Sequence, residues 1–318
     1  MFKFALRDIG PALALLVMIC VFALASRQFL SVENIRVILE SSAIPVILVV
    51  GLTFVLLQGS IDLSIEGVMA TSSMIVALLV KNSMTPYDLG WVGVAIAIAT
   101  GTAFGFVNGI IFTLVRMPSM IVTLATWFVG LGVATLLFPG RQPEILAQEV
   151  SGIVLNRHAG LSLIVYAAVV AAVVGALVQN YSQFGRLSYA IGQDERMARQ
   201  SGRSVRFHKT AAFMLMGTLA GLGGVFISAQ LGVGNPDAGT GFLFPAISAA
   251  VVGGTLLSGG RGGVLHSVVG VLILEVLRNG MIQIGVDPYL RHVVEGFTII
   301  IALIAGNWRL RSRLRVVK

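Results

Sequence analysis

Long uninterrupted apolar runs, such as 9–25 and 91–115, constrain this chain more than any other feature. A run of about 20 apolar residues is long enough to cross the hydrocarbon core of a bilayer as a helix. Because the runs are continuous rather than alternating, they favour helices over the strands of a membrane barrel. Only 11% of the 318 residues are charged, whereas a soluble domain has about 25%. The sequence therefore predicts an all-α, polytopic integral membrane protein and excludes an ordinary soluble enzyme.

About ten membrane-embedded helical segments are predicted along the chain. Their approximate limits are 9–25, 43–57, 63–80, 91–115, 120–138, 160–178, 210–230, 242–258, 264–284 and 292–306. The segments 43–57, 63–80 and 242–258 are short and are interrupted by Gly or Pro, so they are candidates for half-helices or re-entrant pieces. Irregular backbone at membrane depth is tolerated only where it is buried in protein or lines water. We expect one transmembrane domain over residues 1–318.

Positive charge predicts the orientation, because Lys and Arg accumulate in cytoplasmic loops. The loop 179–209 and the tail 307–318 are both rich in these residues, and an even number of segments separates them. Their basic residues are Arg186, Arg196, Arg199, Arg203, Arg206 and Lys209 in the loop, and Arg309, Arg311, Arg313, Arg315 and Lys318 in the tail. The same count places the N-terminus, with Lys3 and Arg7, inside. Both ends are therefore expected to be cytoplasmic, and 139–159 is the longest expected outer loop.

Six polar residues in or beside the apolar segments are candidates for a translocation path. They are Asp62, Ser64, Glu66, Asn108, Glu275 and Asn279. Asp62 begins an apolar segment and is placed to cap the helix that follows it, while Glu66 lies one turn further in. Ionisable groups inside spans are costly and usually face a pathway or a partner.

The other candidates have structural alternatives of similar weight. Glu275 and Arg278 are one helical turn apart and can pair with each other, so a structural role is the default for Glu275. Asn279, which precedes a glycine, is a candidate for the end of its helix. Asn108 can bond another helix or line a path.

Two groups of glycines have different interpretations. Gly101, Gly105 and Gly109 are spaced by four and form one smooth helix face, which permits close helix packing in lipid. The glycines of 253–263 suggest a phosphate-binding loop, but Gly260-Arg261 stands where such a loop requires Lys followed by Ser or Thr. We expect these glycines to form a tight cytoplasmic turn, and no metal-binding cluster of Cys or His is visible.

The basic loop contains a candidate short helix. Asp194 can cap it, and Gly202 can stop it. A solvated loop that simply obeys the positive-inside bias is the alternative interpretation.

Four motifs in chain order resemble the membrane permeases of bacterial ABC sugar importers of the ribose, xylose and galactose class. The motifs are Gly59-Ser-Ile-Asp-Leu-Ser64; Gly105-Phe-Val-Asn-Gly109 with Met117-Pro-Ser-Met-Ile-Val-Thr-Leu124; Tyr189-Ala-Ile-Gly192 with Ala198-Arg199 and Ser201-Gly202; and Ala246-Ile-Ser-Ala-Ala-Val-Val-Gly-Gly254 through Gly259-Gly260-Arg-Gly262. Together they cover roughly residues 30–305.

The resemblance implies a multi-pass permease of the bacterial inner membrane that is not itself an enzyme. It implies import of a monosaccharide or a similar small polar solute, with a second permease copy (the same chain or a sister chain), a periplasmic or lipid-tethered sugar-binding protein, and a cytoplasmic ATPase. That ATPase would bind ATP and Mg²⁺, this chain would hold no cofactor, and no nucleic acid is involved. The ATPase would dock on a short coupling helix. The coupling residues implied are Asp194, Glu195, Arg196, Met197, Ala198, Arg199 and Gly202.

One departure from the family pattern bears on the substrate. Glu66 stands where the family usually has a small residue, so a polyol, an amino sugar or a cationic solute stays open, as does a paired and silent carboxylate. The alternative function is an ion- or proton-coupled secondary transporter that acts without an ATPase. Such transporters usually carry intramembrane acidic or His relays, for which Glu66 and Glu275 are the main candidates here, with His266 near a segment end. A passive channel has no visible selectivity signature.

Overall fold

The computed structural model describes residues 10–307 and is built almost entirely from helices, as predicted. The helices are α1 (Gly10–Ala25), α2 (Val32–Leu57), α3 (Ile65–Leu79), α4 (Trp91–Ile110), the π-helix η1 (Ile111–Val115), α5 (Ser119–Leu136), α6 (Gln148–Leu155), α7 (Leu163–Tyr181), α8 (Gln183–Gln193), α9 (Glu195–Gln200), α10 (Val205–Leu231), α11 (Leu243–Val252), α12 (Val264–Gln283) and α13 (Pro288–Asn307). A short antiparallel pair, β1 (Arg157–His158) and β2 (Leu161–Ser162), lies before α7. The charges of Lys3, Arg7 and the tail beyond 307 lie outside the described residues.

Six of the described helices are long and apolar enough to cross a membrane, which confirms a polytopic membrane protein. They are Val32–Leu57, Trp91–Val115, Ser119–Leu136, Leu163–Tyr181, Val205–Leu231 and Val264–Gln283. Three shorter apolar helices, α1, α3 and α11, accompany them. Two of the three segments expected to be short, 63–80 and 242–258, correspond to α3 and α11.

The third expected short segment, 43–57, was predicted wrongly. It is the second part of α2, a helix of 26 residues that begins at Val32 and contains Pro45. The prediction began this helix at residue 43, whereas the structure begins it at Val32, so that Glu33, Arg36 and Glu40 lie within it. Glu40 is tolerated there because it pairs with Arg157 at 3.6 Å.

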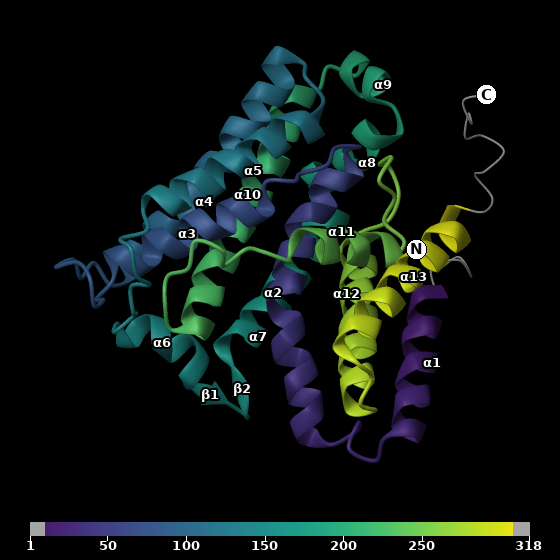
Figure 1. Cartoon of the computed structure of the whole chain (residues 1–318). Helices are drawn as coiled ribbons and strands as arrows, with labels where there is room; N and C mark the ends of the chain where they lie inside the picture. The colour runs from purple at the N-terminus through teal and green to yellow at the C-terminus, as the bar shows by residue number, and fades with distance from the viewer. Residues whose placement is uncertain (1–9, 308–318) are drawn as a thin grey trace.

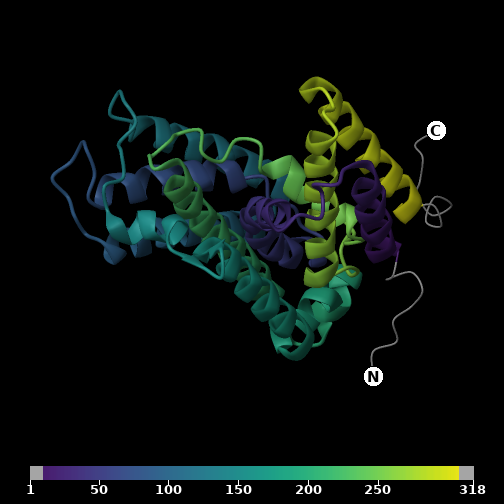
Figure 2. The ribbon, with the colours of Figure 1, turned by 90° about the horizontal axis from the view of Figure 1, so that it is seen from below.

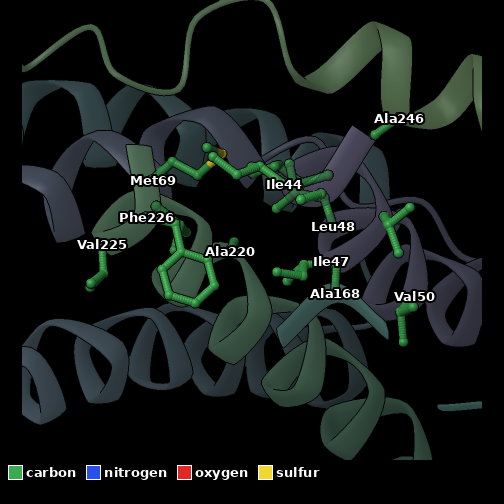
Figure 3. Packing of buried hydrophobic residues seen from close by; sticks show 14 of the residues in the cluster. Ile44, Ile47, Leu48, Val50, Met69, Ala168, Ala220, Val225, Phe226 and Ala246 are labelled. Atoms are coloured by element: carbon green, nitrogen blue, oxygen red, sulfur yellow. The ribbon is translucent and has the colours of Figure 1, made fainter. Parts of the chain in front are cut away.

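The core of the molecule lies around α2. Leu52, Phe54 and Leu56 of this helix have no exposed surface, and α2 runs between two groups of helices. One group contains α3, α4, α5 and α10, and the other contains α1, α12 and α13 (Figures 1 and 2). Figure 3 shows how Ile44 and Leu48 of α2 lie beside Met69, together with residues of α7, α10 and α11.

The two ends of the molecule are built differently. Helices α8 and α9 lie at one end, and β1 and β2 lie at the opposite end (Figure 1). At the α9 end, the turn 253–263 closes against α2, since Gly260 N donates to Leu57 O at 2.9 Å. The turn has positive φ angles at several glycines, including Gly254, Gly259 and Gly262.

At the opposite end, three connecting segments exchange backbone hydrogen bonds. Leu146 N donates to Lys81 O at 2.9 Å, and Ile145 N donates to Gly232 O at 2.8 Å. The expected outer loop 139–159 is therefore structured, and it also contains α6. Paired backbone thus joins the connections after α3, α5 and α10.

Candidate coupling surface and translocation path

The short helix expected in the basic loop is α9, and its ends are set by the residues that the sequence indicated. The side chain of Asp194 accepts from Met197 N at 3.0 Å, which caps the helix. Gly202, two residues beyond the helix, has φ +74°, a conformation that favours glycine. Ala198 faces inward and is 6% exposed, packed with Ile191 and Val205.

The outer face of α9 is open. The side chain of Met197 is 65% exposed, and Arg196 and Arg199 are also exposed. This face of α9 therefore presents one apolar side chain beside two positive charges.

The inner face of α9 is tied to the membrane helices through Glu195. Lys209 Nζ, on the first turns of α10, donates to Glu195 Oε2 at 2.7 Å, and Arg199 donates to Glu195 Oε1 at 2.8 Å. The Lys209 side chain is only 11% exposed, and its ammonium lies 4.8 Å from the ring centre of Phe112. The Glu195–Lys209 ion pair therefore joins α9 to α10. The same Lys209 ammonium contacts η1 through the ring of Phe112.

The same contacts set the protonation of Glu195. Partial burial alone would raise its pKa, but the hydrogen bonds and charges of Lys209 and Arg199 outweigh burial. They hold the pKa of this carboxyl below its usual value. The Glu195 side chain is therefore ionised at neutral pH, and the link to Lys209 is a pair of full charges.

A cavity of about 430 Å³ lies between α9 and the end of η1. Arg116, Arg206 and Lys209 line it together with Glu195. The cavity also has apolar walls, which Phe112, Met117 and Val205 contribute.

Helix α10 also packs closely against α4, where the two helices touch through their backbones. Gly101 faces Gly221, where an added Cβ would lie 2.9 Å from Cα, and Gly109 faces Thr210, where it would lie 2.6 Å from Cα. At Gly105, an added Cβ would collide with the carbonyl oxygen of Phe213. Small residues let helices approach this closely in lipid.

Three of the six path candidates form one buried network. The carboxylate of Asp62 accepts from Ser64 N at 2.8 Å and from Ser64 Oγ at 2.6 Å. Asn108 Nδ2 donates to Ser64 Oγ at 2.9 Å, and Thr126 Oγ1 donates to Asn108 Oδ1 at 2.7 Å. The network joins the segment before α3 to α4 and α5, and all four side chains are buried.

The expected capping role of Asp62 is wrong. The residue at the start of α3 is Ser64, which makes no side-chain capping bond. Asp62 bonds the residue two positions ahead instead, as Asp commonly does in turns. An Asp side chain can either cap a helix or bond the backbone two residues ahead in a turn. The motif around Asp62 is compatible with both, so the sequence alone did not distinguish a cap from a turn.

Glu66 lies apart from this network. Its Oε1 accepts from Gly241 N at 3.0 Å and from Leu243 N at 3.1 Å, at the start of α11. The structure thus places Glu66 against backbone amides rather than beside Asp62 and Asn108.

Glu275 and Asn279 lie in a third place, on α12. Glu275 is 3.9 Å from Arg278, which also contacts Glu295 at 3.3 Å. Asn279 does not end its helix as expected, because α12 continues to Gln283. It exchanges two hydrogen bonds of 2.9 Å with Asn34 of α2.

Sequence reasoning missed several partners of these residues. Asn34, Thr126 and Lys209 are polar residues in or next to apolar segments. The six path candidates were selected by this same criterion, so it could have found these three as well. Their roles depend on which helices pack together, and one of them bonds a residue 245 positions away.

The family model described as "Branched-chain amino acid transport system / permease component" matches residues 34–303. The chain belongs to this permease family. Members are multi-pass permease components of the inner membrane and are not enzymes themselves. A permease of this family works with an ATP-binding subunit and a substrate-binding protein.

Several curated relatives match along most of their length. The "Ribose import permease protein RbsC" of Bacillus subtilis (strain 168) is 32% identical over 305 residues, which cover 95% of this chain and 94% of the relative. The "D-allose transport system permease protein AlsC" of Escherichia coli (strain K12) is 30% identical, with 95% and 93% covered. The "L-arabinose transport system permease protein AraH" of the same strain is 28% identical, with 84% and 80% covered. No solved structure matches the chain.

Proposed function

We propose that this chain is the transmembrane subunit of an ATP-driven importer that carries a monosaccharide of the pentose or hexose class across the inner membrane. The observation that carries the proposal is full-length similarity to relatives named for ribose, allose and arabinose transport. Four motifs in chain order support it, and one of them includes Gly202, which follows the end of α9. A periplasmic or lipid-tethered binding protein supplies the sugar.

The coupling surface is α9 with its flanking residues, Asp194 to Gly202. The ATPase, which binds ATP and Mg²⁺, docks on the exposed face around Met197, and the Glu195–Lys209 pair passes its motion to α10. The backbone contacts of Gly101, Gly105 and Gly109 with α10 carry that motion on to α4. This chain needs no bound cofactor of its own for these steps.

The translocation path is completed by a second permease copy, because the path candidates of one copy are separated. Asp62, Ser64 and Asn108 form a closed network, whereas Glu66 bonds α11 and Asn279 bonds α2. A path between two copies is consistent with this separation. Whether the partner is the same chain or a sister chain is settled by what copurifies.

The alternative, a secondary transporter without an ATPase, needs a relay of free acidic side chains. Glu66 accepts two backbone amides, and Glu275 lies beside Arg278. Neither arrangement offers a chain of proton carriers, so the structure favours the importer.

The test is purification of the tagged chain from native membranes in detergent, followed by ATPase and reconstituted uptake assays with ribose, allose and arabinose. An ATP-binding subunit is expected to copurify and to be lost in the Arg196→Glu, Met197→Asp double variant. Arg186→Glu, at the same end of the molecule but on α8, is the matched control and should retain it. A chain that purifies alone and still transports after reconstitution would show the proposal to be wrong.

A further inference from the structure

Helix α11 begins inside the protein with amides that it cannot satisfy alone. The first turn of any helix has backbone N–H groups without partners in that helix. Leu243, the first residue of α11, is 1% exposed, so water does not solvate it. Phe242, at the capping position, has no acceptor side chain and makes no capping bond. The acceptor must therefore come from another part of the chain.

Glu66 of α3 supplies that acceptor. A single carboxylate oxygen accepts from Gly241 N at 3.0 Å and from Leu243 N at 3.1 Å. Glu66 is 6% exposed, and 175 positions separate it from Gly241. A carboxylate at a helix N-terminus also meets the positive end of the helix dipole. The geometry is that of a helix cap donated by a distant helix.

The backbone before α11 fits closely around the first turn of α3. Gly239 lies directly against Glu66, where an added Cβ would be 2.7 Å from Glu66 Cα. The approach is possible only without a side chain at this position. The segment 239–243 therefore holds the backbone of Glu66 as well as its carboxylate.

This contact joins two parts of the bundle. Helix α3 is bound to α5, since Thr71 Oγ1 donates to Gly130 O at 2.8 Å. Helix α11 packs against α12, where Gly270 faces the backbone of Ala249, and it is drawn between the two groups of helices in Figure 1. Through its two hydrogen bonds, the Glu66 carboxylate connects α3 and α5 to α11 and α12.

We propose that Glu66 is a positioning residue, which caps α11 from α3 and keeps this short helix in register during transport. The proposal rests on the importer function above and deepens it.

Three substitutions separate a cap from a charge-binding site. Glu66→Gln retains an oxygen at the same reach, Glu66→Asp retains the charge but withdraws the oxygen, and Glu66→Ala removes both. In the reconstituted importer, we expect Glu66→Gln to transport nearly as well as wild type. Glu66→Asp and Glu66→Ala should lose about tenfold in maximal rate, the scale of one lost hydrogen-bonded acceptor, with KM little changed. The opposite order, with Glu66→Asp better than Glu66→Gln or with KM raised in Glu66→Gln, would overturn the proposal.

Amide hydrogen exchange of the purified protein tests the cap without any transport assay. Residues 239–246 should exchange about tenfold faster in Glu66→Asp and Glu66→Ala than in wild type, because the capped amides open more readily. Glu66→Gln and the control Glu275→Gln, which changes an acidic side chain of α12, should leave this segment protected. Unchanged exchange in Glu66→Asp would overturn the cap. Failure of wild type to transport would count against the importer function alone, since the exchange result does not depend on it.

Discussion

The Lys209–Glu195 pair joins the surface helix α9 to the membrane helix α10. The ammonium of Lys209 is largely buried, lies over Phe112 and reaches the carboxylate of Glu195 at 2.7 Å. Removing one member of such a pair leaves the other charge poorly solvated, which costs more than an exposed pair contributes. The sequence marked Glu195 as a coupling residue but counted Lys209 only as part of a basic loop.

The lowered pKa of Glu195 has a defined consequence for stability against pH. A carboxyl whose pKa is lowered by folding contributes stability that is present above its usual pKa of 4.5 and is lost as pH falls through the lowered value. The difference in melting temperature between wild type and Glu195→Gln should therefore be constant from about pH 6 to 8 and shrink below about pH 4. Thermal unfolding in detergent measures it, with the exposed Glu149→Gln as control. A difference that already shrinks between pH 8 and 6 would contradict this assignment.

At the scale of elements, the contact between α4 and α10 depends on the absence of side chains. Gly105→Ala places a methyl group against the carbonyl of Phe213, so the helices must separate. We expect a loss of about 1–3 kcal/mol in stability, as for other overpacked interiors. Gly132→Ala on α5, where no atom lies within 4 Å of the added Cβ, is the matched control and should be neutral or slightly stabilising. Equal melting temperatures of the two variants would argue against close backbone packing.

The polar network between α4 and α5 gives a second prediction. Thr126→Val removes the hydroxyl that donates to Asn108 Oδ1 at 2.7 Å and leaves a buried amide oxygen without this donor. The cost should be about 1–3 kcal/mol. Thr100→Val removes an exposed hydroxyl that bonds only its own helix, at Ile96 O, and should cost little. Thermal unfolding of both variants in the same detergent measures the two losses of stability. Equal melting temperatures of Thr126→Val and Thr100→Val would contradict the network.

The sequence predicted helices best where apolar runs and caps agree. Helix α9 has its cap at Asp194 and its stop near Gly202, because both signals are local. The start of α2 was misplaced, and Glu33 and Arg36 make the first turns of this helix more polar than the rest. The cap at Asp62 was wrong because a turn and a helix cap use the same side chain.

At the scale of the whole molecule, the family and fold class followed from motifs and hydropathy, but the arrangement of polar residues did not. Asn34 and Asn279 face each other across 245 positions, and Glu66 faces α11. Such pairs depend on which helices are neighbours in space, and apolar periodicity does not determine this. Candidates chosen by residue type therefore fell into three separate places.

The hydrogen bonds between Glu66 and the start of α11 have a consequence for the synthesis and assembly of the protein. Synthesis at about 5–20 residues per second takes roughly 9–35 s to reach Gly241 after Glu66 has been made. During that interval the nascent chain holds an apolar helix with a carboxylate whose amide partners do not yet exist. Completion of this one contact is thus a late event in assembly, and truncation before residue 239 removes both amide donors to Glu66.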